Sequence, residues 1–117
     1  PLAVKLLYGG ITEELLMRWG VMTLLLWLGW RLLQRGHGQP GKGLVALAVL
    51  LSALLFAVGH LPAAQALAGV LTMPVVAFVL VGNTVFGLVA GGLFARHGLE
   101  AAIIAHVLAH LLASPLL

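Results

Sequence analysis

Between Lys42 and Arg96 the chain contains no aspartate, glutamate, lysine or arginine. Only 8% of all residues are charged, whereas soluble domains carry about 25% charged residues. A soluble fold of 117 residues needs a polar surface, which so few charges cannot provide. The sequence therefore predicts an integral membrane protein whose apolar runs cross the bilayer as helices.

The apolar pattern predicts an all-α integral membrane bundle with four long helices plus one short helix. The first long helix is expected to begin at Thr12, whose hydroxyl can cap free backbone N–H groups, and to end near Gln34. Its length of about 34 Å exceeds the hydrocarbon core of about 30 Å. The remaining elements are expected at residues 44–60, 62–70 (short), 73–96 and 99–114, after a glycine-rich loop at 35–43. Gly87 and Gly91 form a GxxxG pair, which favours close helix packing.

The whole of residues 1–117 is interpreted as a single intramembrane domain in a multi-pass cell-membrane protein. Because the chain begins with Pro1 rather than methionine, we expect it to be the core of a longer membrane protein. The net charge of +3 comes without a basic run interleaved with aromatic residues, so nucleic acid is not an expected partner, whereas membrane lipids are. Alternating helices place one set of cations on a common side, which the positive-inside rule makes cytoplasmic. This set is Arg31, Arg35, Lys42 and Arg96.

Ionisable groups at membrane depth are costly and often mark function, so the few such residues define the candidate site. The chain has no cysteine and no aspartate, which leaves only three glutamates for carboxylate chemistry. Helix alternation brings Glu13 and Glu14 to the depth of three imidazoles, those of His60, His106 and His110. Glu14 and Arg18 are four residues apart and can pair, and His106 and His110 share a helix face by the same spacing.

Three kinds of hydrolytic site were compared with these residues. The string HVLAH has Val107 where a zinc peptidase of the HExxH type has glutamate, although His60, His106 and His110 remain a possible zinc site. Ser52 lacks a nucleophile-elbow turn, and Ser114 is at a helix end. The remaining route is water activated by a carboxylate, with other polar groups holding the oxyanion.

Three short motifs, in order, resemble those of one membrane-protease family. EELLMR matches EExxxR, FAVGH matches FxxxH, and HVLAH matches HxxxN except at its last position. The chain thus resembles the CPBP family of CAAX-type prenyl-protein endopeptidases and bacteriocin-processing enzymes, also called Abi, over residues 12–114.

The resemblance implies an intramembrane glutamic endopeptidase that acts on a lipidated or hydrophobic peptide without a cofactor. Glu13 would activate water with help from His60, and His106 would stabilise the oxyanion. Glu14 and Arg18 would shape and neutralise the site, while His110 falls where the family has asparagine. An amide always offers a donor, but a neutral imidazole offers one only in the right tautomer, so the resemblance supports the fold more strongly than the activity.

Two other functions remain open on the sequence alone. One is a non-catalytic membrane scaffold, or a bacteriocin-immunity type of protein that binds a membrane partner through the same cavity. The other is a zinc metallopeptidase that uses His60, His106 and His110.

Overall fold

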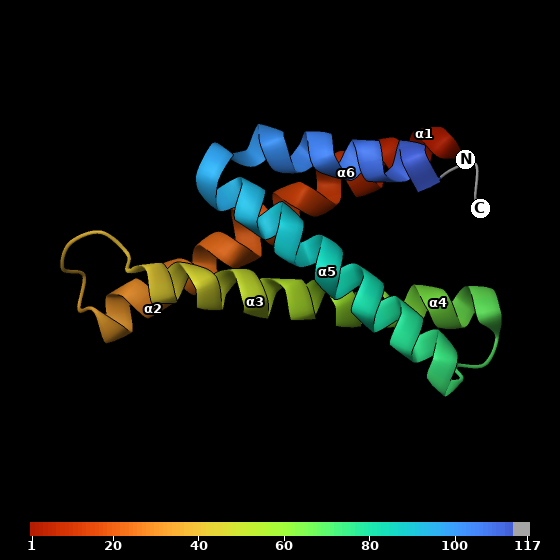
Figure 1. Cartoon of the computed structure of the whole chain (residues 1–117), viewed down its shortest axis with the longest axis horizontal. Coiled ribbons are helices and arrows are strands. Elements are labelled where there is room, and N and C mark those ends of the chain that lie inside the picture. Colours follow the sequence, from red (N-terminus) through yellow and green to blue (C-terminus); the bar gives the residue numbers. More distant parts are fainter. Residues whose placement is uncertain (114–117) are drawn as a thin grey trace.

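The computed structural model describes residues 1–113, and helices connected by short links make up this range. One continuous helix spans residues 2–33 and has four stretches: α1 (Leu2–Val4), η1 (Lys5–Thr12), η2 (Leu15–Met22) and α2 (Thr23–Leu33). The later helices are α3 (Lys42–Gly59), α4 (Leu61–Ala68), α5 (Met73–His97) and α6 (Leu99–Ala113). Figure 1 shows α5 crossing α3 diagonally, while α6 lies beside the beginning of the N-terminal helix. The predicted number of helices agrees with this arrangement, and the predicted end of α6 at Ser114 lies outside the described residues.

The predicted start of the first helix at Thr12 is wrong. Thr12 lies inside the continuous helix and caps nothing, so Glu13 and Glu14 are not in a first turn but about 16 Å from its beginning. The two η stretches are π-helical, and the backbone N–H of Glu13 donates to the carbonyl of Tyr8, five residues earlier. Such wide turns are rare and often occur at functional sites. Here they flank the two glutamates on both sides.

Two adjacent glycines lie inside the helix, ahead of its expected start, and pack against α6. A Cβ on Gly9 would collide with the imidazole of His110, and a Cβ on Gly10 would collide with the side chain of Val107. Both glycines are buried, so they allow α6 to pack directly on η1 instead of breaking the helix. The apolar residues that precede Thr12 therefore form part of the bundle.

The GxxxG pair on α5 does bring two helices together, as predicted. A Cβ on Gly87 would lie 2.8 Å from the Cα of Ala53, and one on Gly91 would lie 2.9 Å from Cγ1 of Val49. Ala53 is fully buried at this crossing. Small residues thus let the backbones of α3 and α5 approach closely.

The loop after α2 is held by the side chain of Gln34. Its amide nitrogen donates to the carbonyls of His37 and Gln39, and its oxygen accepts from the backbone N–H of Gly41 at 2.7 Å. This network ends the loop at Gly41, so Lys42, which was assigned to the loop, is the first residue of α3.

The polarity of the molecule is inverted relative to a soluble domain. The largest fully buried side chains include Arg18 and Glu14, whereas large apolar residues such as Leu67 (91% exposed) and Phe78 (82% exposed) cover the surface. Two helical segments, Lys42–Ala68 and Met73–His97, are long and apolar enough to cross a membrane by length and composition. Buried charges with exposed apolar side chains are the pattern that a lipid environment favours.

Candidate active site

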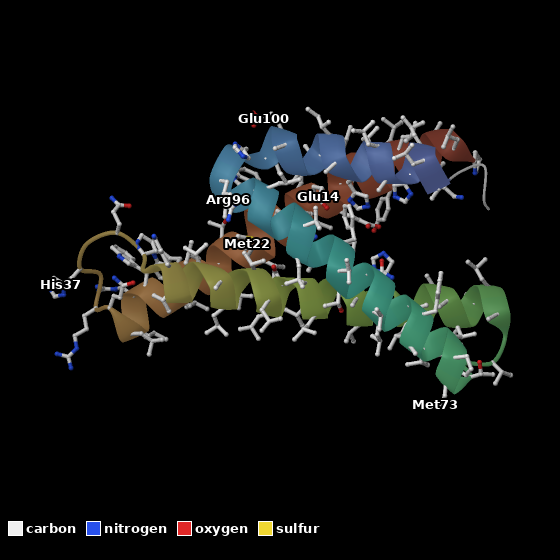
Figure 2. All side chains as sticks on the ribbon, viewed as in Figure 1. Glu14, Met22, His37, Met73, Arg96 and Glu100 are labelled. Atoms are coloured by element: carbon white, nitrogen blue, oxygen red, sulfur yellow. The ribbon has the colours of Figure 1, made fainter. Side chains whose placement is uncertain are left out.

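The N-terminal helix positions the only carboxylate pair of the chain at the centre of the bundle. Figure 2 shows Glu14 in the interior, where α6 lies over the N-terminal helix near the crossing with α5. Glu14 and Arg18 have no exposed surface, whereas the side chain of Glu13 is 21% exposed. Adjacent helix positions differ in direction by about 100°, which explains why one carboxylate is buried and the other reaches a cavity.

Glu14 joins the N-terminal helix to α6 through the imidazole of His106. Nδ1 of His106 lies 2.7 Å from Oε2 of Glu14, and both side chains are buried. Because an ionised carboxylate only accepts, Nδ1 must carry a proton. The bond fixes the ring and directs Nε2 away from Glu14.

Arg18 supplies the positive charge that this buried carboxylate requires. Its Nε lies 3.4 Å from Oε1 of Glu14, and its Nη2 donates to the carbonyl of Gly87 on α5 at 3.4 Å. The guanidinium also lies 4.7 Å from the centre of the Phe56 ring on α3. Arg18 therefore links three helices, and its removal would leave Glu14 as a buried charge without its cation.

The other carboxylate, Glu13, faces two imidazoles from two further helices. Its Oε1 lies 3.7 Å from Nε2 of His60 and 3.9 Å from Nε2 of His106. Both separations are too long for a direct hydrogen bond. These separations permit a water molecule beside the pair that contacts Oε1 of Glu13 and one ring nitrogen at about 2.8 Å each.

The orientation of His60 follows from a local hydrogen bond. Its Nδ1 lies 2.6 Å from the carbonyl of Phe56, one turn earlier in α3. Since a carbonyl only accepts, Nδ1 carries the proton, and in a neutral ring Nε2 is an acceptor directed towards Glu13. The break between α3 and α4 occurs at His60, so this side chain is at the edge of the cavity and not inside a straight helix.

An open cavity of about 180 Å³ adjoins the carboxylate. Glu13 and His60 form its polar part, and most of the remaining lining is apolar. The apolar lining residues are Leu16, Met17, Leu55 and Phe56, together with the ring of Tyr8. The cavity suits an apolar ligand whose polar group reaches Glu13.

His110 is placed differently from the other two imidazoles. Its ring stacks on that of His106, with centroids 4.9 Å apart and an interplanar angle of 16°. Its Nε2 is buried against Gly9 and has no hydrogen-bond partner among the described residues. Within residues 1–113, His110 makes no ion pair with Glu13. The structure thus brings His60 and His106 to the carboxylate and places His110 behind His106.

Two contacts of the site were missed in the sequence. Tyr8 lines the cavity with Glu13 because a π-helical turn puts residues five apart on one face, and the spacing was not recognised. Phe86 packs against His106 with ring centroids 4.6 Å apart. Its position immediately before Gly87, in the close-packing motif, was the available signal.

Metal binding was also considered for the imidazoles. Among residues 1–113, no three histidine, aspartate or glutamate side chains are grouped as a ligand set for one metal ion. The zinc hypothesis for His60, His106 and His110 stays a prediction, which metal analysis can test.

Comparison with known proteins decides the family. The sequence model of one family, described as type II CAAX prenyl endopeptidase Rce1-like, matches residues 1–112. The chain belongs to this family. No curated protein and no solved structure is significantly similar to it.

The Rce1-like assignment confirms the predicted relation to CAAX proteases. At the level of the family it implies a membrane-associated peptidase, which agrees with the two membrane-capable helices. The match begins at residue 1, so it includes the π-helical segment that precedes the motif EELLMR.

Proposed function

We propose that this Rce1-like chain is an intramembrane endopeptidase that cleaves a peptide bond with water activated by Glu13. The observation that supports it best is the approach of one carboxylate to two imidazoles, at 3.7 and 3.9 Å, beside an open cavity. Three helices, which are separate in sequence, supply these groups.

In the first step, Glu13 and His60 hold the attacking water. The water donates one hydrogen bond to the Glu13 carboxylate and one to Nε2 of His60. Its oxygen attacks the carbonyl carbon of the substrate while Glu13 takes the proton, so the carboxylate acts as a general base. The product is a tetrahedral intermediate with a negative oxygen.

His106 stabilises that oxyanion through Nε2. This role requires a proton on Nε2 of His106 in addition to the one that Nδ1 donates to Glu14. In that form Nδ1–H donates to Glu14 and Nε2–H donates to the oxyanion, which is a preorganised arrangement of the kind that lowers the barrier. Glu14 and Arg18 act on the reaction by positioning this ring.

The intermediate then collapses without a covalent enzyme adduct. The carbon–nitrogen bond breaks, and protonated Glu13 returns its proton to the leaving amine. A serine route is not supported, because the hydroxyl of Ser52 donates to the carbonyl of Val49 within α3 and is fully buried.

The proposed substrate is a lipidated or hydrophobic peptide that enters from the membrane. The apolar lining of the cavity next to Glu13 supports this choice, since an apolar chain can occupy it while the peptide reaches the carboxylate. The protein would span the cell membrane several times, which agrees with its exposed apolar side chains.

Substitution of one glutamate tests this proposal. Glu13→Gln should abolish cleavage of a fluorogenic farnesylated CAAX peptide in proteoliposomes, because an amide cannot take the proton from water. Glu100→Gln is the matched control, since Glu100 is exposed at the start of α6 and should keep full turnover. A Glu13→Gln variant that folds and still cleaves would refute the proposal, and binding of the peptide without cleavage by the parent chain would favour a scaffold.

A further inference from the structure

A second cavity lies at the other end of the α3–α5 contact. It measures about 790 Å³ and lies between the beginning of α3 and the end of α5. Figure 2 shows Arg96 at this end of α5, apart from Glu14 in the middle of the molecule. The catalytic proposal uses none of the residues that line this groove.

The walls of the groove are apolar. Val45 and Val49 of α3 form one side, and Leu88 of α5 contributes to the other. A Cβ on Gly92 would meet nothing within 4 Å, so the missing side chain of this glycine leaves part of the space open. An open apolar groove between two membrane-capable helices faces the acyl-chain region when those helices cross a bilayer.

Two cations border the groove at one end. Lys42 lies in the first turn of α3 and Arg96 in the last turn of α5, and both are exposed. Neither forms an ion pair with any of the three glutamates, all of which the structure describes. In addition, α3 begins without a side-chain cap, so its free N–H groups and helix dipole add positive potential near Lys42.

We propose that this groove binds an anionic phospholipid. The phosphate lies between Lys42 and Arg96, and one acyl chain follows the apolar walls past Gly92. Charge complementarity selects an anionic headgroup, and the groove of about 790 Å³ next to the cations selects a lipid over a soluble anion. The side on which Lys42 and Arg96 lie is also the predicted cytoplasmic side, where anionic lipids are concentrated. This binding site does not depend on peptidase activity.

The direct test is lipid titration of the purified full chain in detergent, followed by native mass spectrometry. The probes are palmitoyl-oleoyl phosphatidylglycerol and the phosphatidylcholine with the same chains. We expect phosphatidylglycerol to bind more tightly. Each cation should contribute about a factor of five to its affinity, so Lys42→Gln with Arg96→Gln should weaken binding about 25-fold. A Lys5→Gln, Arg35→Gln chain has the same net charge and should bind like the parent.

The apolar part of the site is tested with a second variant and its matched control. Gly92→Leu places a side chain at the groove, where its Cβ would meet nothing within 4 Å, and should reduce phosphatidylglycerol binding with both cations present. Gly82→Leu is the control, because Gly82 is also an α5 glycine with open space around it but does not line the groove. Equal binding of the two lipids, unchanged affinity in either groove variant, or equally tight binding of soluble glycerophosphoglycerol would overturn the proposal. Circular dichroism confirms that each variant is folded.

Discussion

Replacing Arg18 by methionine should destabilise the protein because it leaves the Glu14 carboxylate buried without its guanidinium partner. Both side chains are fully buried, with 3.4 Å between Nε and Oε1. The guanidinium also donates to the Gly87 carbonyl and contacts the Phe56 ring, and each of these is worth about 1–2 kcal/mol. Removing one partner of a buried ion pair costs about 3–5 kcal/mol, so the stranded charge dominates the loss.

A double variant separates the charge effect from lost packing. Glu14→Gln with Arg18→Met removes both charges but keeps an amide oxygen that can accept from Nδ1 of His106. In the parent, Oε1 of Glu14 and both Nε and Nη1 of Arg18 lack a hydrogen-bond partner among the described residues, so the pair is incompletely satisfied. Replacing such a pair by uncharged side chains is often close to neutral. We expect the double variant to be at least about 2 kcal/mol more stable than Arg18→Met alone, because the stranded charge is gone while the lost contacts with Gly87 and Phe56 are common to both variants.

The measurement is the free energy of unfolding in mixed micelles, from denaturing-detergent titration followed by circular dichroism. Arg35→Met serves as the control, because Arg35 is exposed in the loop after α2 and should change stability by less than about 0.5 kcal/mol. Two results would refute the reasoning: an Arg18→Met variant as stable as the control, or a double variant as unstable as Arg18→Met alone.

Three further predictions concern packing, the departure from the family pattern, and metal. Gly87→Ala should lower the free energy of unfolding by about 1–3 kcal/mol, because its Cβ meets the backbone of Ala53. The control Gly82→Ala should be neutral or slightly stabilising. Equal free energies of unfolding for the two variants in the same assay would contradict the packing of α3 on α5. His110→Asn should keep or raise turnover of the CAAX peptide, since an amide always offers a donor; complete loss would show that the imidazole itself is required. Dialysis against a chelator should leave turnover unchanged, and stoichiometric zinc whose removal abolishes activity would support the metallopeptidase alternative instead.

The helices and the ion pair were predictable because they depend on local patterns. The long apolar runs predicted α3 and α5 to within two residues, and the spacing of four predicted the pairing of Glu14 with Arg18. The GxxxG motif predicted the close contact at Gly87, because a small-residue pair leaves the same space in any bundle.

The start of the first helix and the position of His110 were not predictable in the same way. In the sequence alone, Gly9 and Gly10 look like helix breakers. Only the close approach of α6 in the structure shows why glycine is needed at both positions. Helical spacing placed His110 on the same face as His106 but could not show that it stacks on that ring instead of facing Glu13. Both features depend on contacts between segments about 100 residues apart, Gly9 with His110 and Gly10 with Val107, which no local pattern encodes.

The most direct test of the proposed mechanism is an experimental structure of the chain in lipid, at a resolution that shows ordered water. We predict that Oε1 of Glu13 lies within about 4 Å of Nε2 of both His60 and His106, as in the 3.7 and 3.9 Å separations described above, with a water bound to the carboxylate. A Glu13 side chain turned towards lipid, or separated from both imidazoles by more than one bridging water, would contradict the mechanism.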